Sequence, residues 1–274
     1  MRYHGGKWRI APWIISHFPP HRVYVESFGG AASVLLRKAR SYAEVYNDAD
    51  GEIVNLFRVL RDNTQAESLR RAVELTPYSR EEFIESYKST QDPIEQARRT
   101  LLRAFAGFCS GSACGYQTGF RSYVARRGTT PAGDWGRFAE HIPSIAARIA
   151  GVVIEHSTAI DVITRYDTPE TLHYVDPPYS MSTRSKRNIY RFEMTDDDHR
   201  ALGDALRALR GMVVLSGYAC GLYDDELYPD WRRVTKATVG DGAVKRTEVL
   251  WLNQAAVNNG APLFSRANMR GAMQ

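Results

Sequence analysis

Residues 22–31, Arg-Val-Tyr-Val-Glu-Ser-Phe-Gly-Gly-Ala, carry the pattern that decides the fold. The β-branched and aromatic composition of residues 22–25 predicts a short strand, residues 26–30 form a turn pattern, and residues 31–36 are typical of the start of a helix. A second strand is predicted at residues 42–46, and it ends at Asn47-Asp-Ala-Asp50. A strand, a glycine turn, a helix and an acidic strand end together favour a parallel sheet that binds a cofactor.

The same alternation returns after residue 150 and completes an α/β, Rossmann-like core with a mixed, mostly parallel sheet. Two late strands are expected to form an antiparallel hairpin at the sheet edge, and a helix is expected to begin at Thr195, an N-cap followed by three acids. The predicted strands are 151–155, 172–175, 212–216, 231–235 and 248–252, and the predicted helices are 157–165 and 195–209.

The stretch between these two parts has a different character, with predicted helices at residues 67–75, 80–87 and 93–106 and a Gly/Ser/Tyr-rich segment up to residue 136. We therefore predict a discontinuous core of residues 1–61 and 144–260, a mainly helical insert of residues 62–143, and a tail of residues 261–274.

Composition excludes several classes of protein. The 274 residues include 36 Lys or Arg and 31 Asp or Glu, and their 43% hydrophobic content argues against a disordered chain, a collagen or a coiled coil. No apolar run approaches the ~18–20 residues of a membrane span, and the polar N-terminus lacks the apolar core of a signal peptide. We expect a cytoplasmic protein with no membrane partner. Cys109, Cys114 and Cys220 are expected to be reduced thiols that bind no metal.

The net charge of +5 gathers in two segments without acids. Six arginines with interleaved aromatic residues lie between Gln96 and Gly133, which is typical of a nucleic-acid-binding module, although a helical lid with solvated arginines would have the same composition. The second segment, residues 180–191, is expected to hold phosphates or to be a solvated loop.

Tyr174-Val-Asp-Pro-Pro-Tyr179 has the clearest chemistry. Its carboxylate follows a buried strand, where open α/β sheets bind ligands. Two prolines contribute carbonyl acceptors but no N–H donors, and an aromatic ring follows. Acceptors beside a flat ring suit an exocyclic amino group on an aromatic base, whereas an ordinary proline turn is the alternative.

Asp176-Pro-Pro-Tyr179 resembles the catalytic motif of amino-group DNA methyltransferases, and Phe28-Gly-Gly30 resembles their S-adenosylmethionine motif. The order of cofactor motif, basic insert and catalytic motif resembles the Dam-type (class D12, alpha-group) adenine-N6 DNA methyltransferases. Further segments similar to this family are Tyr3-His-Gly-Gly-Lys7, Asn47-Asp48, Ser216-Gly-Tyr218 and Lys245-Arg-Thr-Glu248. The resemblance implies a methyltransferase core with an inserted target-recognition domain, a bacterial, archaeal or phage origin, and a role in restriction-modification, repair marking or phage protection.

The resemblance also implies S-adenosylmethionine as cofactor, with no metal. Lys7 would hold the methionine carboxylate, and Asp48, with Asp50 as its alternative, would accept the ribose hydroxyls. Gly29 and Gly30 would let the backbone approach the cofactor. The implied cofactor contacts are Tyr3, Lys7, Phe28, Gly29, Gly30, Asp48, Asp161 and Asp176. For Asp161, an exposed helix acid is an equal alternative to a contact with the cofactor adenine.

The implied reaction is direct methylation of adenine N6 in double-stranded DNA by a monomeric enzyme. The adenine would be flipped out and stacked on Tyr179, while Asp176 and the carbonyl of Pro177 accept its amino hydrogens and Pro178 completes the motif. An RNA adenine-N6 methyltransferase, a DNA cytosine-N4 methyltransferase and a non-catalytic DNA-binding module are the alternatives. The expected DNA contacts are Arg121, Arg126, Arg127, Arg184, Lys186 and Arg187.

Overall fold

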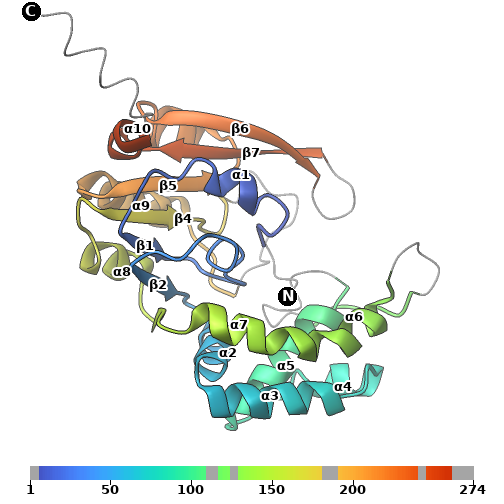
Figure 1. The fold of residues 1–274 in the computed structure, drawn as a ribbon. Helices are drawn as coiled ribbons and strands as arrows, with labels where there is room; N and C mark the ends of the chain where they lie inside the picture. The colour runs from blue at the N-terminus through green and yellow to red at the C-terminus, as the bar shows by residue number, and fades with distance from the viewer. Residues whose placement is uncertain (1–5, 109–116, 124–128, 181–190, 240–244, 261–274) are drawn as a thin grey trace, which may run out of the picture.

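A seven-stranded sheet organises the computed structural model, which describes residues 6–108, 117–123, 129–180, 191–239 and 245–260. The strand order is β3-β2-β1-β4-β5-β7-β6, and only β7 runs antiparallel to its neighbours (Figure 1). This mixed, mostly parallel sheet with a late antiparallel pair confirms the predicted fold class. The strands are β1 (Val23–Glu26), β2 (Ala43–Asn47), β3 (Val153–Glu155), β4 (Thr171–Val175), β5 (Met212–Gly217), β6 (Arg232–Val239) and β7 (Lys245–Leu252).

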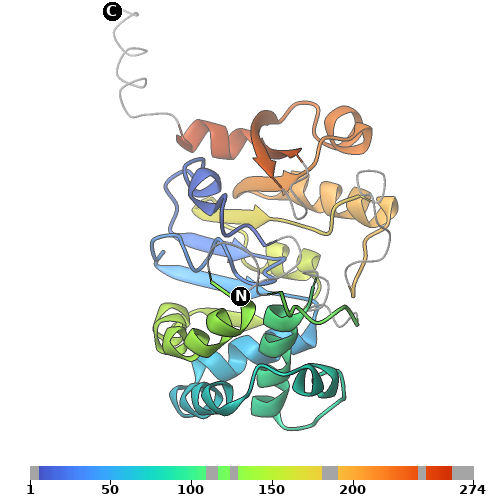
Figure 2. The same cartoon turned by 90° about the vertical axis from the view of Figure 1, so that its right-hand side faces the viewer.

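Helices cover both faces of the sheet, and Figures 1 and 2 show α2 to α7 together on the side where β2 lies. Within the described ranges, no helix is long and apolar enough to cross a membrane. The helices are α1 (Ala11–Ile15), α2 (Gly51–Arg61), α3 (Asn63–Leu75), α4 (Arg80–Glu85), α5 (Pro93–Ala106), α6 (Pro131–Phe138), α7 (Ile142–Ile149), α8 (Ala159–Arg165), α9 (Asp196–Ala208) and α10 (Gln254–Gly260), with a 3-10 turn, η2 (Ala139–His141), and a π-helical segment, η4 (Leu222–Leu227).

Alternation along the central strands divides the core into two apolar clusters. Tyr174 in β4 and Val214 in β5 face the cluster that includes α1 and α2. Val175 and Leu215, one position further along each strand, face the cluster that includes α8 and α9. Because successive side chains of a strand point to opposite faces of the sheet, each central strand packs against helices on both faces.

Short polar side chains set where the helices begin. Thr195 and Asp198 form a capping box at the start of α9, which confirms the N-cap that the sequence predicted. Asp50 caps α2 by accepting a hydrogen bond from the Glu52 amide, and Asp92 caps α5 in the same way. These caps satisfy amide groups that have no partner inside the helix.

The helix predicted at residues 31–36 does not form, and the structure has turns there instead. Gly30 and Ala32 have φ angles of 47° and 52°, in the left-handed region that an α-helix cannot contain. The prediction was wrong because apolar periodicity does not detect a left-handed backbone. The turn brings Leu35 back over the end of β1, where its amide donates to Glu26.

Gly29 is required by a contact within the protein. A Cβ atom at Gly29 would lie 2.1–2.6 Å from ring atoms of Tyr46, the neighbouring residue on β2. The Tyr46 hydroxyl also donates a hydrogen bond of 2.7 Å to the Gly30 carbonyl, and its ring packs on Phe57 of α2. Tyr46 therefore supports the glycine turn from below, and only glycine leaves room for its ring.

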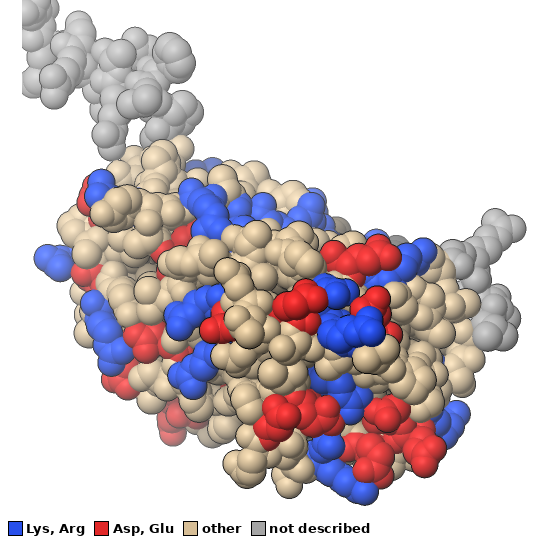
Figure 3. All heavy atoms as spheres, turned by 60° about the horizontal axis from the view of Figure 1, so that its bottom comes forward, with Lys and Arg blue, Asp and Glu red and all other residues tan. Residues whose placement is uncertain are grey.

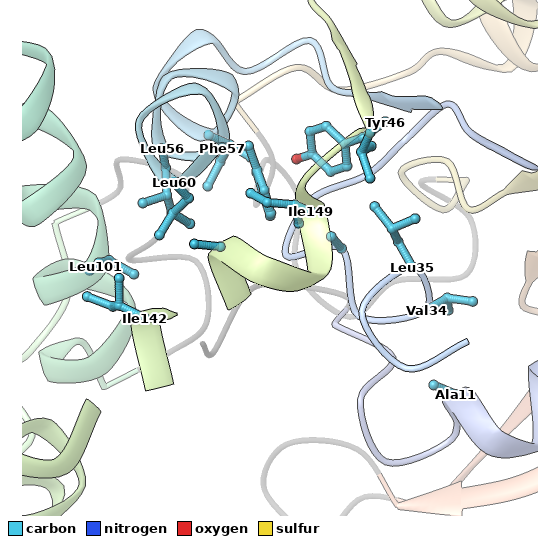
Figure 4. Close-up of a cluster of buried hydrophobic side chains, with 14 of the residues drawn as sticks. Ala11, Val34, Leu35, Tyr46, Leu56, Phe57, Leu60, Leu101, Ile142 and Ile149 are labelled. Carbon is cyan, nitrogen blue, oxygen red and sulfur yellow. The ribbon is translucent and has the colours of Figure 1, made fainter. Parts of the chain in front are cut away.

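The helical insert and the core share one apolar cluster. Leu56 and Leu60 of α2 pack with Leu101 of α5 and with Ile142 and Ile149 of α7 (Figure 4). The predicted boundary at residues 61 and 62 falls between α2 and α3, and the one at residues 143 and 144 falls within α7. The division of the chain into core, insert and tail stays a prediction, with an apolar cluster that crosses both boundaries.

We predict that Gly29→Ala lowers the free energy of unfolding by about 2–3 kcal/mol, because the added methyl group overpacks the Tyr46 ring. Urea denaturation measures this change. Gly136→Ala in α6 is the matched control, since a Cβ there meets no atom within 4 Å, and it should be neutral or slightly stabilising. Equal effects of the two substitutions would contradict the assigned role of Gly29.

Candidate active site

Three acidic side chains meet where parallel strands end. Glu26 ends β1, Asp48 follows β2 and Asp176 follows β4, and all three line a cavity of about 380 Å³. In the sheet, β1 lies between β2 and β4, and the chain order runs outward from β1 in opposite directions on its two sides. Cavities at such a switch point are the usual ligand sites of open α/β sheets, and this volume is sufficient for a small-molecule ligand.

The rest of the cavity wall comes from the glycine turn and from segments far along the chain. Phe28, Gly29 and Gly30 form one side, and their expected contact with a cofactor stays a prediction. Residues 158–160 at the start of α8 and residues 191–194 before α9 form other parts of the wall. Asp161, which was expected to reach the ligand, is exposed in the first turn of α8 and does not line the cavity.

Lys7 is buried and lies against Asp176 and Tyr179 of the Asp-Pro-Pro-Tyr motif. Its Nζ atom is 2.9 Å from Oδ1 of Asp176 and 3.5 Å from Oε1 of Glu248, and it donates a hydrogen bond to the Tyr179 hydroxyl. The family resemblance implies that Lys7 holds a cofactor carboxylate, and this role stays a prediction. In the structure Lys7 lines the cavity, and its ammonium forms ion pairs with Asp176 and Glu248.

Burial raises the pKa of the Asp176 carboxyl to about 6; the Lys7 ammonium opposes this shift, and nearby Glu248 adds to it. Asp176 is therefore mostly ionised at pH 7 and can accept hydrogen bonds through both oxygens. A buried carboxylate with few competing waters is a stronger acceptor than an exposed one.

Asp48 fastens two turns beside the cavity. Its Oδ2 accepts the Gly30 amide at 2.7 Å, and its Oδ1 accepts the Asp50 amide at 2.8 Å. Burial raises the pKa of Asp48 to about 6, although these two hydrogen bonds oppose the shift. Asp50 lines the same cavity, and its Oδ2 atom is buried without a hydrogen-bond partner among the described residues.

Glu26 was not identified from the sequence. It accepts hydrogen bonds from the Tyr24 hydroxyl at 2.7 Å and from the Leu35 amide at 2.9 Å. Burial raises the pKa of Glu26 to about 8, although both hydrogen bonds oppose the shift. The signal that could have found it is its place at the carboxyl end of β1, the same edge of the sheet at which Asp176 follows β4.

The Tyr179 ring is held on several sides. Its hydroxyl donates to Oε1 of Glu248 at 2.6 Å, and the same oxygen accepts from Ser216 at 2.8 Å. The ring meets Tyr218 edge-on, with 4.4 Å between the ring centroids. Within the motif, Pro178 lines the cavity and Pro177 is buried. Tyr179 is only 7% exposed, so base stacking on its ring stays a prediction.

Arg121 differs from the exposed position expected of a DNA contact. It is 6% exposed, and its guanidinium donates to the Phe105 carbonyl at 2.7 Å and to the Tyr123 hydroxyl at 2.9 Å. These contacts hold two parts of the insert together. The other residues that we expected at the cofactor or DNA lie outside the described residues: Tyr3, Arg126, Arg127, Arg184, Lys186 and Arg187.

Arginines at the start of the basic segment between Gln96 and Gly133 lie close to acidic side chains from outside that segment. Arg98 pairs with Glu82 of α4 and with Glu95, and Arg99 also pairs with Glu95. Arg103 pairs with Glu52 at the start of α2. On one face of the molecule, Figure 3 shows acidic and basic side chains side by side. The first part of the segment is therefore used in ion pairs within the protein.

Arg191 joins the cavity wall to this ionic network. Its guanidinium lies 3.1 Å from Asp50 and 3.1 Å from Glu52, while Arg103 approaches the other oxygen of Glu52. The insert, the start of α2 and the segment before α9 are thus connected by charge at the cavity. Among the residues that the structure describes, no group of three or more His, Cys, Asp or Glu is arranged to hold a metal.

Comparison with known proteins gives one family. The model of the family described as D12 class N6 adenine-specific DNA methyltransferase matches residues 3–226. The match includes the glycine turn, the insert and the Asp176 motif, and it ends before β6 and β7. No curated protein matches the chain at a significant level.

We predict that Lys7→Met raises the pKa of Asp176 above about 6, because it leaves this carboxyl beside Glu248 without the ammonium. Titration of ¹³C-labelled aspartate side chains by NMR measures the shift. Lys88→Met, which removes an exposed lysine of the insert, should leave the Asp176 pKa unchanged. An unchanged or lowered pKa in Lys7→Met would contradict the proposed charge pairing.

Proposed function

The chain belongs to the D12 class of N6 adenine-specific DNA methyltransferases, and we propose that it transfers the methyl group of S-adenosylmethionine to N6 of an adenine flipped out of double-stranded DNA. The observation that carries this proposal is the position of Asp176. Its carboxylate follows β4 and lines the cavity formed by the glycine turn, Glu26 and Asp50. An acceptor for the adenine amino group is thus adjacent to a space for the methyl donor.

The residues of the cavity fit the cofactor. The unpartnered Oδ2 of Asp50 can accept a ribose hydroxyl, whereas both oxygens of Asp48 already accept backbone amides. Glu26 suits the positively charged methionine end, because a nearby cation would favour its ionised form. Phe28 and Leu202 offer apolar surface to the adenine and the thioether chain. S-Adenosylmethionine would supply an electrophilic methyl group on its sulfonium.

Asp176 and the Pro177 carbonyl would then orient the substrate. The lone pair of an adenine amino group is delocalised into the ring, so the group is a weak nucleophile. Two acceptors that bind both amino hydrogens would direct the lone pair toward the methyl group, by positioning and electrostatics. Lys7 keeps Asp176 ionised for this purpose. We also propose that Tyr179 stacks on the flipped base and that Arg126, Arg127, Arg184, Lys186 and Arg187 contact DNA phosphates.

We predict that the purified chain forms N6-methyladenine in duplex DNA and that Asp176→Ala lowers this rate at least about 100-fold, as expected when one preorganised electrostatic group is removed. Mass spectrometry of digested nucleosides measures the product, and calorimetry measures cofactor binding, which should persist in the variant. Asp204→Ala is the matched control, because Asp204 is exposed on α9 and does not line the cavity.

Each alternative has its own outcome in this assay. N4-methylcytosine in the digest would replace the adenine assignment, and methylation of RNA in place of DNA would replace the DNA assignment. Binding of DNA without cofactor binding or methyl transfer would favour a non-catalytic module. An Asp176→Ala enzyme that retains normal activity would remove Asp176 from the mechanism.

A second prediction concerns the aromatic ring. Tyr179→Ala should lower kcat/KM about 10-fold or more, since base stacking contributes ~1–3 kcal/mol. Tyr179→Phe should stay within several-fold of the wild type, because it keeps the ring and loses only the hydrogen bonds of the hydroxyl with Glu248 and Lys7. Tyr42→Ala, at a tyrosine that is 78% exposed, controls for loss of a ring elsewhere. If the Phe and Ala variants at position 179 behave alike, the ring does not stack.

A further inference from the structure

The β6–β7 hairpin extends beyond the rest of the sheet at its catalytic edge. β5 ends at Gly217, which pairs with Val249, so residues 245–248 of β7 continue past the end of β5. Their partners on β6 are residues 236–239. β7 runs antiparallel to β5, so its start lies at the edge where β4 delivers Asp176 (Figure 1). The hairpin and the insert therefore lie on opposite sides of the active site (Figure 2).

One face of this projecting part is basic and turned toward the catalytic motif. Residues two apart on a strand, and residues directly opposite on its partner, share a face. Glu248 and Arg246 thus share a face with their partners Lys236 and Thr238. Glu248 is buried, where its carboxylate pairs with Lys7 and accepts a hydrogen bond from the Tyr179 hydroxyl. The cations on this face are Lys236, which is exposed, and Arg246, which is half-buried.

Arg246 is connected to the catalytic ring through a single residue. Its guanidinium carbon lies 5.2 Å from the centre of the Tyr218 ring, and its Nη1 donates a hydrogen bond of 3.1 Å to the Tyr218 hydroxyl. Tyr218 in turn packs edge-on against Tyr179. Neither Arg246 nor Tyr218 lines the cofactor cavity. Arg246 is therefore a half-buried cation held close to Tyr179 but outside the space assigned to the cofactor.

We propose that the projecting face of the β6–β7 hairpin is a second DNA-contacting surface, on which Arg246 binds the backbone phosphate beside the target adenine. The inference rests on the proposed function. A guanidinium has five N–H donors in a planar fork, so a hydrogen bond to Tyr218 and a contact with phosphate are compatible. Tyr218 limits the conformations of the Arg246 side chain, which reduces the entropy lost when a phosphate binds. Lys236 extends the same positive face toward α1.

A purely structural role for Arg246 makes a different prediction. If Arg246 only orients Tyr218 and Tyr179, its loss should lower kcat and leave the salt dependence of DNA binding unchanged. A phosphate contact should raise KM for DNA and also change that salt dependence, because each phosphate neutralised releases counterions. The two roles are therefore separable by ionic strength.

The experiment compares Arg246→Ala, Arg246→Lys and Arg232→Ala in the full chain. A DNA duplex that the wild-type enzyme methylates serves as substrate at saturating S-adenosylmethionine, over a range of salt concentrations. Arg232→Ala is the matched control, because Arg232 is exposed on the partner strand β6 and pairs with Leu252 at the other end of the hairpin. Calorimetry with S-adenosylmethionine alone checks that each variant keeps an intact cofactor site.

For Arg246→Ala we expect KM for DNA to rise about 10-fold or more, in line with the loss of a charge-assisted hydrogen bond. The slope of log KM against log salt should fall by about 0.9. Arg246→Lys should recover most of the affinity, and Arg232→Ala should match the wild type. Unchanged KM and slope in Arg246→Ala, or a lower kcat with an unchanged slope, would overturn this inference. A wild-type enzyme that methylates no DNA would instead overturn the proposed function.

Discussion

A buried ammonium that pairs with the carboxylates of Asp176 and Glu248 is the interaction on which this edge of the sheet depends. Lys7 joins the N-terminal segment to Asp176 after β4 and to Glu248 on β7. Loss of one member of a buried ion pair costs about 3–5 kcal/mol, because the remaining charge is left uncompensated. The same ammonium favours ionised Asp176 despite burial. One side chain therefore holds three segments together and sets the charge of the proposed acceptor.

Burial at this edge raises the pKa of Glu26, Asp48 and Asp176. Keeping these acids out of water disfavours their charged forms, so the site is electrostatically costly for the free protein. The same low dielectric strengthens each interaction with a cationic or hydrogen-bond-donating ligand. A methyl donor that carries positive charge and an amino group that donates two hydrogens both suit such a site. The fold brings the three acids to one edge of the sheet, and their burial raises their pKa values and strengthens their interactions with a ligand.

Charge illustrates how far sequence clustering and spatial clustering can differ. Arg98 and Arg103 belong to a segment without acids, yet they pair with Glu82 and Glu52 from other helices. Arg246 belongs to no basic run that the sequence singled out, but the hairpin places it on Tyr218, which packs against the Tyr179 ring. Ion pairs inside the protein use part of the apparent excess of charge. What remains for a polyanion depends on where strands and helices place individual cations.

The sequence by itself determined the strands, the glycine turn, the capped helix at Thr195 and the acids Asp48 and Asp176 at strand ends. Alternation, turn composition and capping are local, and the carboxyl ends of parallel strands share an edge. Only the tertiary structure decided that Lys7 meets Tyr179, 172 positions away, that Tyr46 requires Gly29, and that residues 31–36 turn through a left-handed backbone. Local periodicity does not specify which distant side chains come into contact, because those contacts depend on how the sheet and its helices pack.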